Sequence, residues 1–130
     1  MIRSFIAVAI APEIVERIAS AITELKPRIA GVRWVAPGNI HLTLKFLGSM
    51  DEATIDTIGD RLHAHLRLFQ RFTINAKGLG VFPGLKRPRV LWVGLNSDRL
   101  VLLASGVGFA LQPLGFVPES RPFTPHLTIG

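Results

Sequence analysis

The 130-residue chain carries 15 Lys and Arg against 9 Asp and Glu, a formal net charge of +6, and its isoelectric point is about 11.1. This length suits one domain with its own core, and the positive charge favours an anionic partner such as nucleic acid, although a basic surface also serves solubility. The chain has no cysteine, which excludes disulfides, thiolate nucleophiles and cysteine metal sites. We therefore expect a soluble domain of the reducing cytoplasm.

The N-terminal part predicts a strand, a helix and a second strand. The short apolar segment 5–11 leads directly into a helix start at Pro12, which favours a buried first strand over a secretory leader. Apolar residues then recur at helical spacing, so 12–29 predicts an amphipathic helix that Gly31 ends. Residues 32–35 predict a short strand, and Pro37-Gly38 a turn.

The rest of the chain continues the alternation of strands and helices. Asp51 is a plausible helix cap, and the helix after it has an apolar stripe expected to be buried. The apolar stretch 101–117 is interrupted and too short to span a bilayer, so we expect no membrane segment. The order of strands and helices along the chain predicts one α+β domain over residues 1–130 without a linker. The strands are expected at 40–47, 71–82, 89–95 and the C-terminus, the last helix at 98–113, and the stripe at Ile55, Ile58, Leu62, Leu66 and Phe69.

One tetrapeptide pattern, His-Leu-Thr-aliphatic, occurs twice. The first motif is His41-Leu42-Thr43-Leu44 and the second motif is His126-Leu127-Thr128-Ile129. Because side chains alternate along a strand, each motif presents its His and Thr on one face and two aliphatic residues on the other. A single His-x-Thr is usually a polar pair on a solvated face, but the repeat favours a functional pair: one imidazole could donate a proton while the other accepts one.

The other basic and histidine residues give weaker signals. Lys86-Arg87-Pro88-Arg89 is the densest basic patch and the remaining cations are scattered, which favours a basic cleft over a duplex-binding tail. His63 and His65 lie two apart in a predicted helix and diverge, so they make a poor metal pair. Lys45 shares a strand face with His41, where it either adds positive charge or snorkels to the surface.

With both motifs placed, the chain resembles the 2H phosphoesterase superfamily and, within it, the RNA 2′,3′-cyclic phosphodiesterases, also called 2′-5′ RNA ligases or LigT-like proteins. The resemblance covers nearly the whole chain and rests on ordered segments in addition to the two motifs. These segments are Phe5-Ile6-Ala7-Val8, Val32-Arg33-Trp34-Val35, His41 to Gly48, Gly80-Val81-Phe82-Pro83, Arg87 to Trp92 and Arg121-Pro122-Phe123-Thr124-Pro125-His126.

The resemblance implies two pseudo-symmetric α+β lobes of largely antiparallel sheet with outer helices, facing each other across a basic cleft. It also implies hydrolysis of RNA 2′,3′-cyclic phosphate ends to 2′-phosphomonoesters, with a reverse ligase reaction. By the same match His41 is the proton donor to the leaving oxygen and His126 the proton acceptor that activates water. Thr43 and Thr128 would bind phosphate oxygens, with Lys45 as a further substrate-binding candidate.

No metal or cofactor is expected, because no third carboxylate or histidine stands at ligand spacing near either motif. The chain also departs from the family pattern at one place. The chain ends at Gly130, two residues after Thr128, whereas family members continue through further strands. We therefore expect a C-terminally truncated domain whose terminal strand could fray, which puts its activity in doubt.

Three alternatives stay open. The same site could act on a small cyclic nucleotide, an ADP-ribose cyclic phosphate or a 2′-5′ linked oligonucleotide. A basic RNA-binding module without chemistry would bind RNA in a salt-sensitive way that survives loss of both histidines. A zinc hydrolase is the least favoured of the three. The sequence leaves the oligomeric state undecided.

Overall fold

The computed structural model describes residues 1–118 and 123–130, so Arg121 and Pro122 of the last matching segment lie outside the described residues. The chain forms two compact units, each assembled from separated segments. Unit 1 contains residues 1–7, 43–75 and 96–125, and unit 2 contains 8–42, 76–95 and 126–130. The cleft expected between two lobes stays a prediction.

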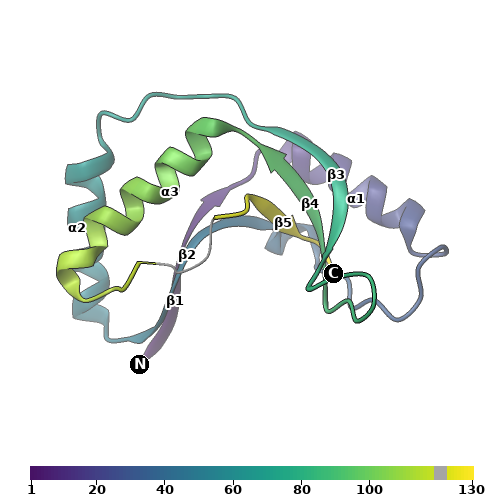
Figure 1. Cartoon of the computed structure of the whole chain (residues 1–130), viewed down its shortest axis with the longest axis horizontal. Helices are drawn as coiled ribbons and strands as arrows, with labels where there is room; N and C mark the ends of the chain where they lie inside the picture. The colour runs from purple at the N-terminus through teal and green to yellow at the C-terminus, as the bar shows by residue number, and fades with distance from the viewer. Residues whose placement is uncertain (119–122) are drawn as a thin grey trace. The chain divides into compact units, whose positions relative to one another are not determined.

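The predicted α+β class is confirmed: the described part of the chain forms a two-stranded and a three-stranded sheet together with helices (Figure 1). Strand order is β1-β2 in the first sheet and β3-β4-β5 in the second. The elements are β1 (Ile2–Ala9), α1 (Pro12–Leu25), η1 (Pro37–Asn39), β2 (His41–Met50), α2 (Glu52–Leu66), β3 (Asn75–Phe82), β4 (Val90–Asn96), α3 (Asp98–Leu111), η2 (Gln112–Leu114) and β5 (His126–Thr128).

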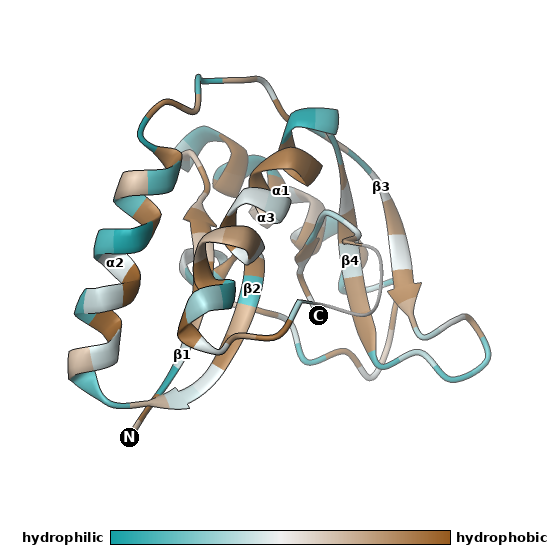
Figure 2. Ribbon diagram, turned by 60° about the vertical axis from the view of Figure 1, so that its left-hand side comes forward, coloured by the Kyte–Doolittle hydropathy of each residue, from teal (hydrophilic) through white to brown (hydrophobic). Residues whose placement is uncertain are grey.

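Unit 1 is built around helices α2 and α3, which pack against each other (Figures 1 and 2). Both begin at a side-chain cap: Asp51 accepts a hydrogen bond from the Thr54 amide, as expected, and Ser97 accepts one from Leu100. In α3, Leu100 is fully buried. In α2, Ile58 is the buried residue of the predicted apolar stripe, and Ile55 of the same stripe is 37% exposed. The apolar face of α2 is therefore narrower than its periodicity predicts.

Unit 2 contains helix α1 and the sheet β3-β4-β5. The helix ends at Leu25, earlier than the predicted residue 29. Pro27 explains the difference, because it has no amide hydrogen to continue the helical ladder. The amides of Arg28 and Ile29 instead both donate hydrogen bonds to the Leu25 carbonyl and form a final turn.

Two strand predictions also need correction. Residues 32–35 form no regular strand, although the Val35 amide donates to the Ile129 carbonyl at 2.9 Å. The first strand was expected to be buried, but β1 alternates between exposed and half-buried residues, and Phe5 is 44% exposed. A strand in a two-stranded sheet with one covered face gives this alternation.

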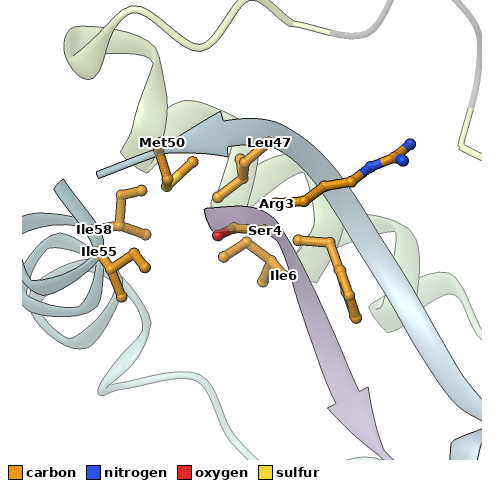
Figure 3. Close-up of a pocket in the computed structure, with 8 residues that line it drawn as sticks. Arg3, Ser4, Ile6, Leu47, Met50, Ile55 and Ile58 are labelled. Carbon is orange, nitrogen blue, oxygen red and sulfur yellow. The ribbon is translucent and has the colours of Figure 1, made fainter. Parts of the chain in front are cut away.

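A shallow pocket opens in unit 1 between β1, β2 and α2 (Figure 3). Met50, Ile55 and Ile58 make its apolar wall, and the guanidinium of Arg3 extends away from them. Neither motif contributes a residue to its lining. Within the described residues, no helix has the length and apolar character needed to cross a membrane.

Candidate functional site

The first motif lies at the start of β2 and shows the predicted alternation. Leu42 is 0% exposed and Leu44 is 8% exposed, whereas His41 and Thr43 are half-buried. Leu42 and Leu44 pack in the interior, and their burial holds the strand backbone that carries His41 and Thr43 in place.

A main-chain contact orients the His41 ring. Its Nδ1 lies 2.8 Å from the carbonyl oxygen of Asn39, the last residue of the turn η1. A carbonyl can only accept, so Nδ1 carries the hydrogen and donates it. Nε2 is therefore the ring nitrogen on the side away from this main-chain contact.

The second motif forms β5, which pairs antiparallel with β4. His126 stands opposite Gly94, Leu127 opposite Val93 and Thr128 opposite Trp92. Leu127 and Ile129 are 0% and 1% exposed, while His126 and Thr128 are half-buried. The second motif thus repeats the alternation of the first.

The end of this strand is bonded on two sides. The Ile129 amide donates to the Leu91 carbonyl at 2.9 Å, and the Ile129 carbonyl accepts from Val35 at 2.9 Å. Leu91 in turn donates to the Gly130 carbonyl at 2.8 Å. These bonds and the burial of Leu127 oppose the fraying expected for this segment.

Two aromatic rings hold the His126 imidazole. Phe82 meets it edge to face, with ring centroids 5.1 Å apart and planes at 86°, and Trp92 lies 6.2 Å away at 60°. The two aromatic rings also contact each other at 5.1 Å. This aromatic bracket, Phe82 and Trp92, restricts the orientation of the imidazole.

The space for the bracket comes from glycines in β3 and β4. A Cβ added at Gly80 would lie 2.1 Å from Cζ2 of Trp92, and one added at Gly94 would lie 2.8 Å from the Lys77 carbonyl oxygen. Any larger residue would displace the indole or the backbone. The indole Nε1 is buried and has no hydrogen-bond partner among the described residues.

The sequence alone assigns no role to Phe82 and Trp92, because buried aromatic residues are common in protein cores. The available signal is the combination of Trp92 with Gly80 on the neighbouring strand β3 and Gly94 on its own strand β4. That signal becomes readable only once the strand register is known.

Lys45 is buried instead of lying at the surface. Its side chain is 6% exposed, and Nζ donates to the Val117 carbonyl oxygen at 3.0 Å. The snorkelling alternative is therefore wrong. The bond joins β2 to the segment that follows η2 within unit 1, so the structure gives this lysine a tethering role.

The candidate residues are distributed over the two units. His41, His126 and Thr128 belong to unit 2, whereas Thr43 and Lys45 belong to unit 1. His63 and His65 lie on α2 in unit 1, and His65 contacts Arg61 and Phe109 there. No group of three or more His, Cys, Asp or Glu residues in the described segments is arranged to hold a metal ion.

A family profile matches residues 8–92 of the chain, and the family is described as LigT like Phosphoesterase. Among curated proteins, the RNA 2′,3′-cyclic phosphodiesterase of Thermotoga maritima is 40% identical over 129 residues, which cover 98% of this chain and 68% of the relative. The protein of the same name from Aquifex aeolicus is 41% identical over 90% of this chain and 62% of the relative. The chain thus spans about two thirds of the length of these relatives.

Solved structures agree with this match. A crystal structure of a Thermus thermophilus protein superposes with a TM-score of 0.89 at 29% identity and covers 98% of this chain and 73% of that one. E. coli LigT in complex with 3′-AMP superposes with a TM-score of 0.79 at 31% identity, covering 98% and 71%.

Proposed function

Because the chain belongs to the LigT like phosphoesterase family, we propose that it is an RNA 2′,3′-cyclic phosphodiesterase. The reaction opens the cyclic phosphate at an RNA end: water forms a new bond to phosphorus, and the bond from phosphorus to O3′ breaks. The product is a 2′-phosphomonoester beside a free 3′-hydroxyl. With the 5′-hydroxyl of a second RNA in place of water, the same attack on phosphorus and the same break of the bond to O3′ would join two RNA ends through a 2′-5′ linkage.

The two histidines divide the proton transfers. His126 accepts a proton from the attacking water, and His41 donates its Nε2 proton to O3′ as that oxygen leaves. Solvent then returns both rings to their starting states. The Asn39 carbonyl supports this role because it keeps a hydrogen on His41 Nδ1 in either protonation state.

The two threonines bind the phosphate. Their hydroxyls donate to non-bridging oxygens, where negative charge increases in the transition state. Thr128 and His126 lie on the same face of β5, two residues apart. Lys45 contributes by holding its strand, since its ammonium group already donates to Val117.

The reaction needs no metal or cofactor in this proposal, since the two imidazoles supply both acid and base. The cysteine-free composition fits a cytoplasmic location. The proposal rests chiefly on one observation: each motif presents a half-buried histidine and threonine on a strand whose alternate residues are almost fully buried.

The test is hydrolysis of an RNA oligonucleotide ending in a 2′,3′-cyclic phosphate, with a chelator present and the position of the product phosphate determined. The proposal predicts a 2′-phosphate from the unmutated chain and little product from His41→Ala and His126→Ala. Full activity in both variants would refute it. RNA binding without product by the folded, unmutated chain would favour the non-catalytic binding module.

A further inference from the structure

The loop between β3 and β4 concentrates positive charge beside the second motif. This basic loop, residues 83–89, contains Lys86, Arg87 and Arg89, and all three are exposed. It extends beyond the ends of the two strands (Figures 1 and 2). It contains no acidic residue, so no carboxylate within the loop offsets its charge.

The charge of the surrounding unit is similarly one-sided. Unit 2 has eight Lys and Arg residues against three acidic residues, and all three acidic residues, Glu13, Glu16 and Glu24, lie on α1. The sheet segments and loops of unit 2 therefore carry cations without any carboxylate side chain. A surface of this kind attracts polyanions.

Main-chain and ring contacts connect the basic loop to His126. The Arg89 amide donates to the Phe82 carbonyl at 2.7 Å and closes the base of the loop. Phe82 is also the residue whose ring meets the His126 imidazole at 5.1 Å. The loop thus begins directly at the aromatic bracket.

We propose that the basic loop binds the phosphates of the RNA strand that precede the terminal cyclic phosphate, an inference that rests on the proposed function. A seven-residue loop that doubles back reaches at most about 12 Å from its base. This reach suits the backbone next to the reacting end and does not extend along a long duplex. Three cations would contact on the order of two or three phosphates.

The chemistry of the loop favours single-stranded RNA over a lipid surface. Electrostatic contacts to phosphates need accessible cations, and the three cations of the loop are exposed. A membrane-binding segment would need a broad apolar face as well. The basic loop has one strongly exposed apolar residue, Leu85, which is 90% exposed.

The test compares two triple variants that each remove three cations from unit 2. One is Lys86→Ala, Arg87→Ala and Arg89→Ala in the basic loop. The matched control is Arg17→Ala, Lys26→Ala and Arg28→Ala, three exposed residues on and after α1. Affinity is measured by fluorescence anisotropy for an RNA oligonucleotide ending in a 3′-phosphate, which leaves no cyclic bond to open, over a series of salt concentrations.

The loop variant should bind this RNA roughly 10²-fold more weakly at about 0.1 M salt. The negative slope of log affinity against log salt should become less steep, its magnitude decreasing by about 2. The control should lose much less. Equal losses in both triple variants would overturn the proposal, since they would indicate net charge alone. Unchanged RNA binding by the loop variant would also overturn the proposal. So would a loop variant that binds RNA normally and loses only its binding to phosphatidylserine vesicles, measured in parallel.

A second readout separates this inference from the proposed function. A 2′,3′-cyclic mononucleotide has no preceding phosphate, so its kcat/KM should be the same for the loop variant and the unmutated chain, while kcat/KM for the cyclic oligonucleotide falls. Equal losses of kcat/KM on both substrates would overturn the inference. If no cyclic phosphate is hydrolysed at all, the proposed function fails, and a loop-specific loss of RNA affinity would still support the basic loop as an RNA-binding element.

Discussion

The two units use the same residue type in different ways. Unit 2 places His126 on a strand between Phe82 and Trp92, opposite a glycine. Unit 1 places His63 and His65 on helix α2, where His65 is exposed and lies 3.3 Å from an Arg61 guanidinium nitrogen. A ring held between two aromatic rings on a strand can be aimed at a reacting atom, whereas the contacts of His65 with Arg61 and Phe109 hold that ring on an exposed face of a helix.

Charge separates the units as well. Unit 2 has eight Lys and Arg residues against three acidic ones, and unit 1 has seven against six. Nearly all of the net charge of +6 therefore belongs to unit 2. The basic character of the chain is thus a local property of the unit that contains both candidate histidines.

Replacing the histidines should give the largest contrast between the units. His41→Ala and His126→Ala should each lower kcat for a cyclic-phosphate RNA by roughly 10² to 10⁴-fold, because each removes one of the two proton transfers. His63→Ala, the matched control in unit 1, should leave kcat unchanged. Steady-state kinetics measures the effect, and circular dichroism checks folding. A loss with His63→Ala as large as with His126→Ala would break the comparison.

A glycine in each unit gives a second, smaller contrast. Gly80→Ala would place a Cβ 2.1 Å from the Trp92 ring, and the displaced indole should disturb His126 and lower kcat by roughly 10-fold or more. Gly59→Ala, in α2, meets nothing within 4 Å and should raise stability by about 0.5 to 1 kcal/mol through helix propensity. Kinetics and urea denaturation of both variants test this. Normal turnover by Gly80→Ala would show that the bracket does not position His126.

The smallest expected effect is the loss of stability at low pH that comes from Asp51, the N-cap of α2 in unit 1. Hydrogen bonds from the Thr54 hydroxyl and amide hold the pKa of Asp51 below its usual 3.8. The folded pKa is depressed, so this stabilisation is present above the unfolded pKa and is lost as pH falls through the folded one. Helix α1 of unit 2 has no side-chain cap.

Asp51→Asn keeps a capping oxygen and removes the titrating group. Its unfolding midpoint in urea should therefore fall less than that of the unmutated chain between about pH 5 and about pH 3. Parallel curves for the two proteins would mean that Asp51 does not contribute to acid sensitivity.

Much of this organisation could be predicted from local sequence. The alternation of polar and aliphatic residues in each motif fixes which face of the strand is buried, and Asp51 marks a helix start by its own chemistry. The early end of α1 was also readable at Pro27, but the apolar periodicity that continues to Ile29 concealed it.

Other features depend on residues that are distant in the sequence. Lys45 is buried and donates a hydrogen bond to the Val117 carbonyl, which is 72 positions away in the sequence. The bracket around His126 needs the β4–β5 register, which no local pattern specifies. Such tertiary contacts decide whether a polar residue is exposed, so propensity and spacing could not predict them.

In the proposed reaction His41 and His126 act together, one as acid and the other as base. The most direct measurement is the kcat of the double variant His41→Ala/His126→Ala beside both single variants, on RNA ending in a 2′,3′-cyclic phosphate. Residues that act as a unit have strongly non-additive effects, so the double variant should be only slightly slower than the slower single variant. Losses that multiply in the double variant would mean that the two histidines act independently, and they would contradict the account.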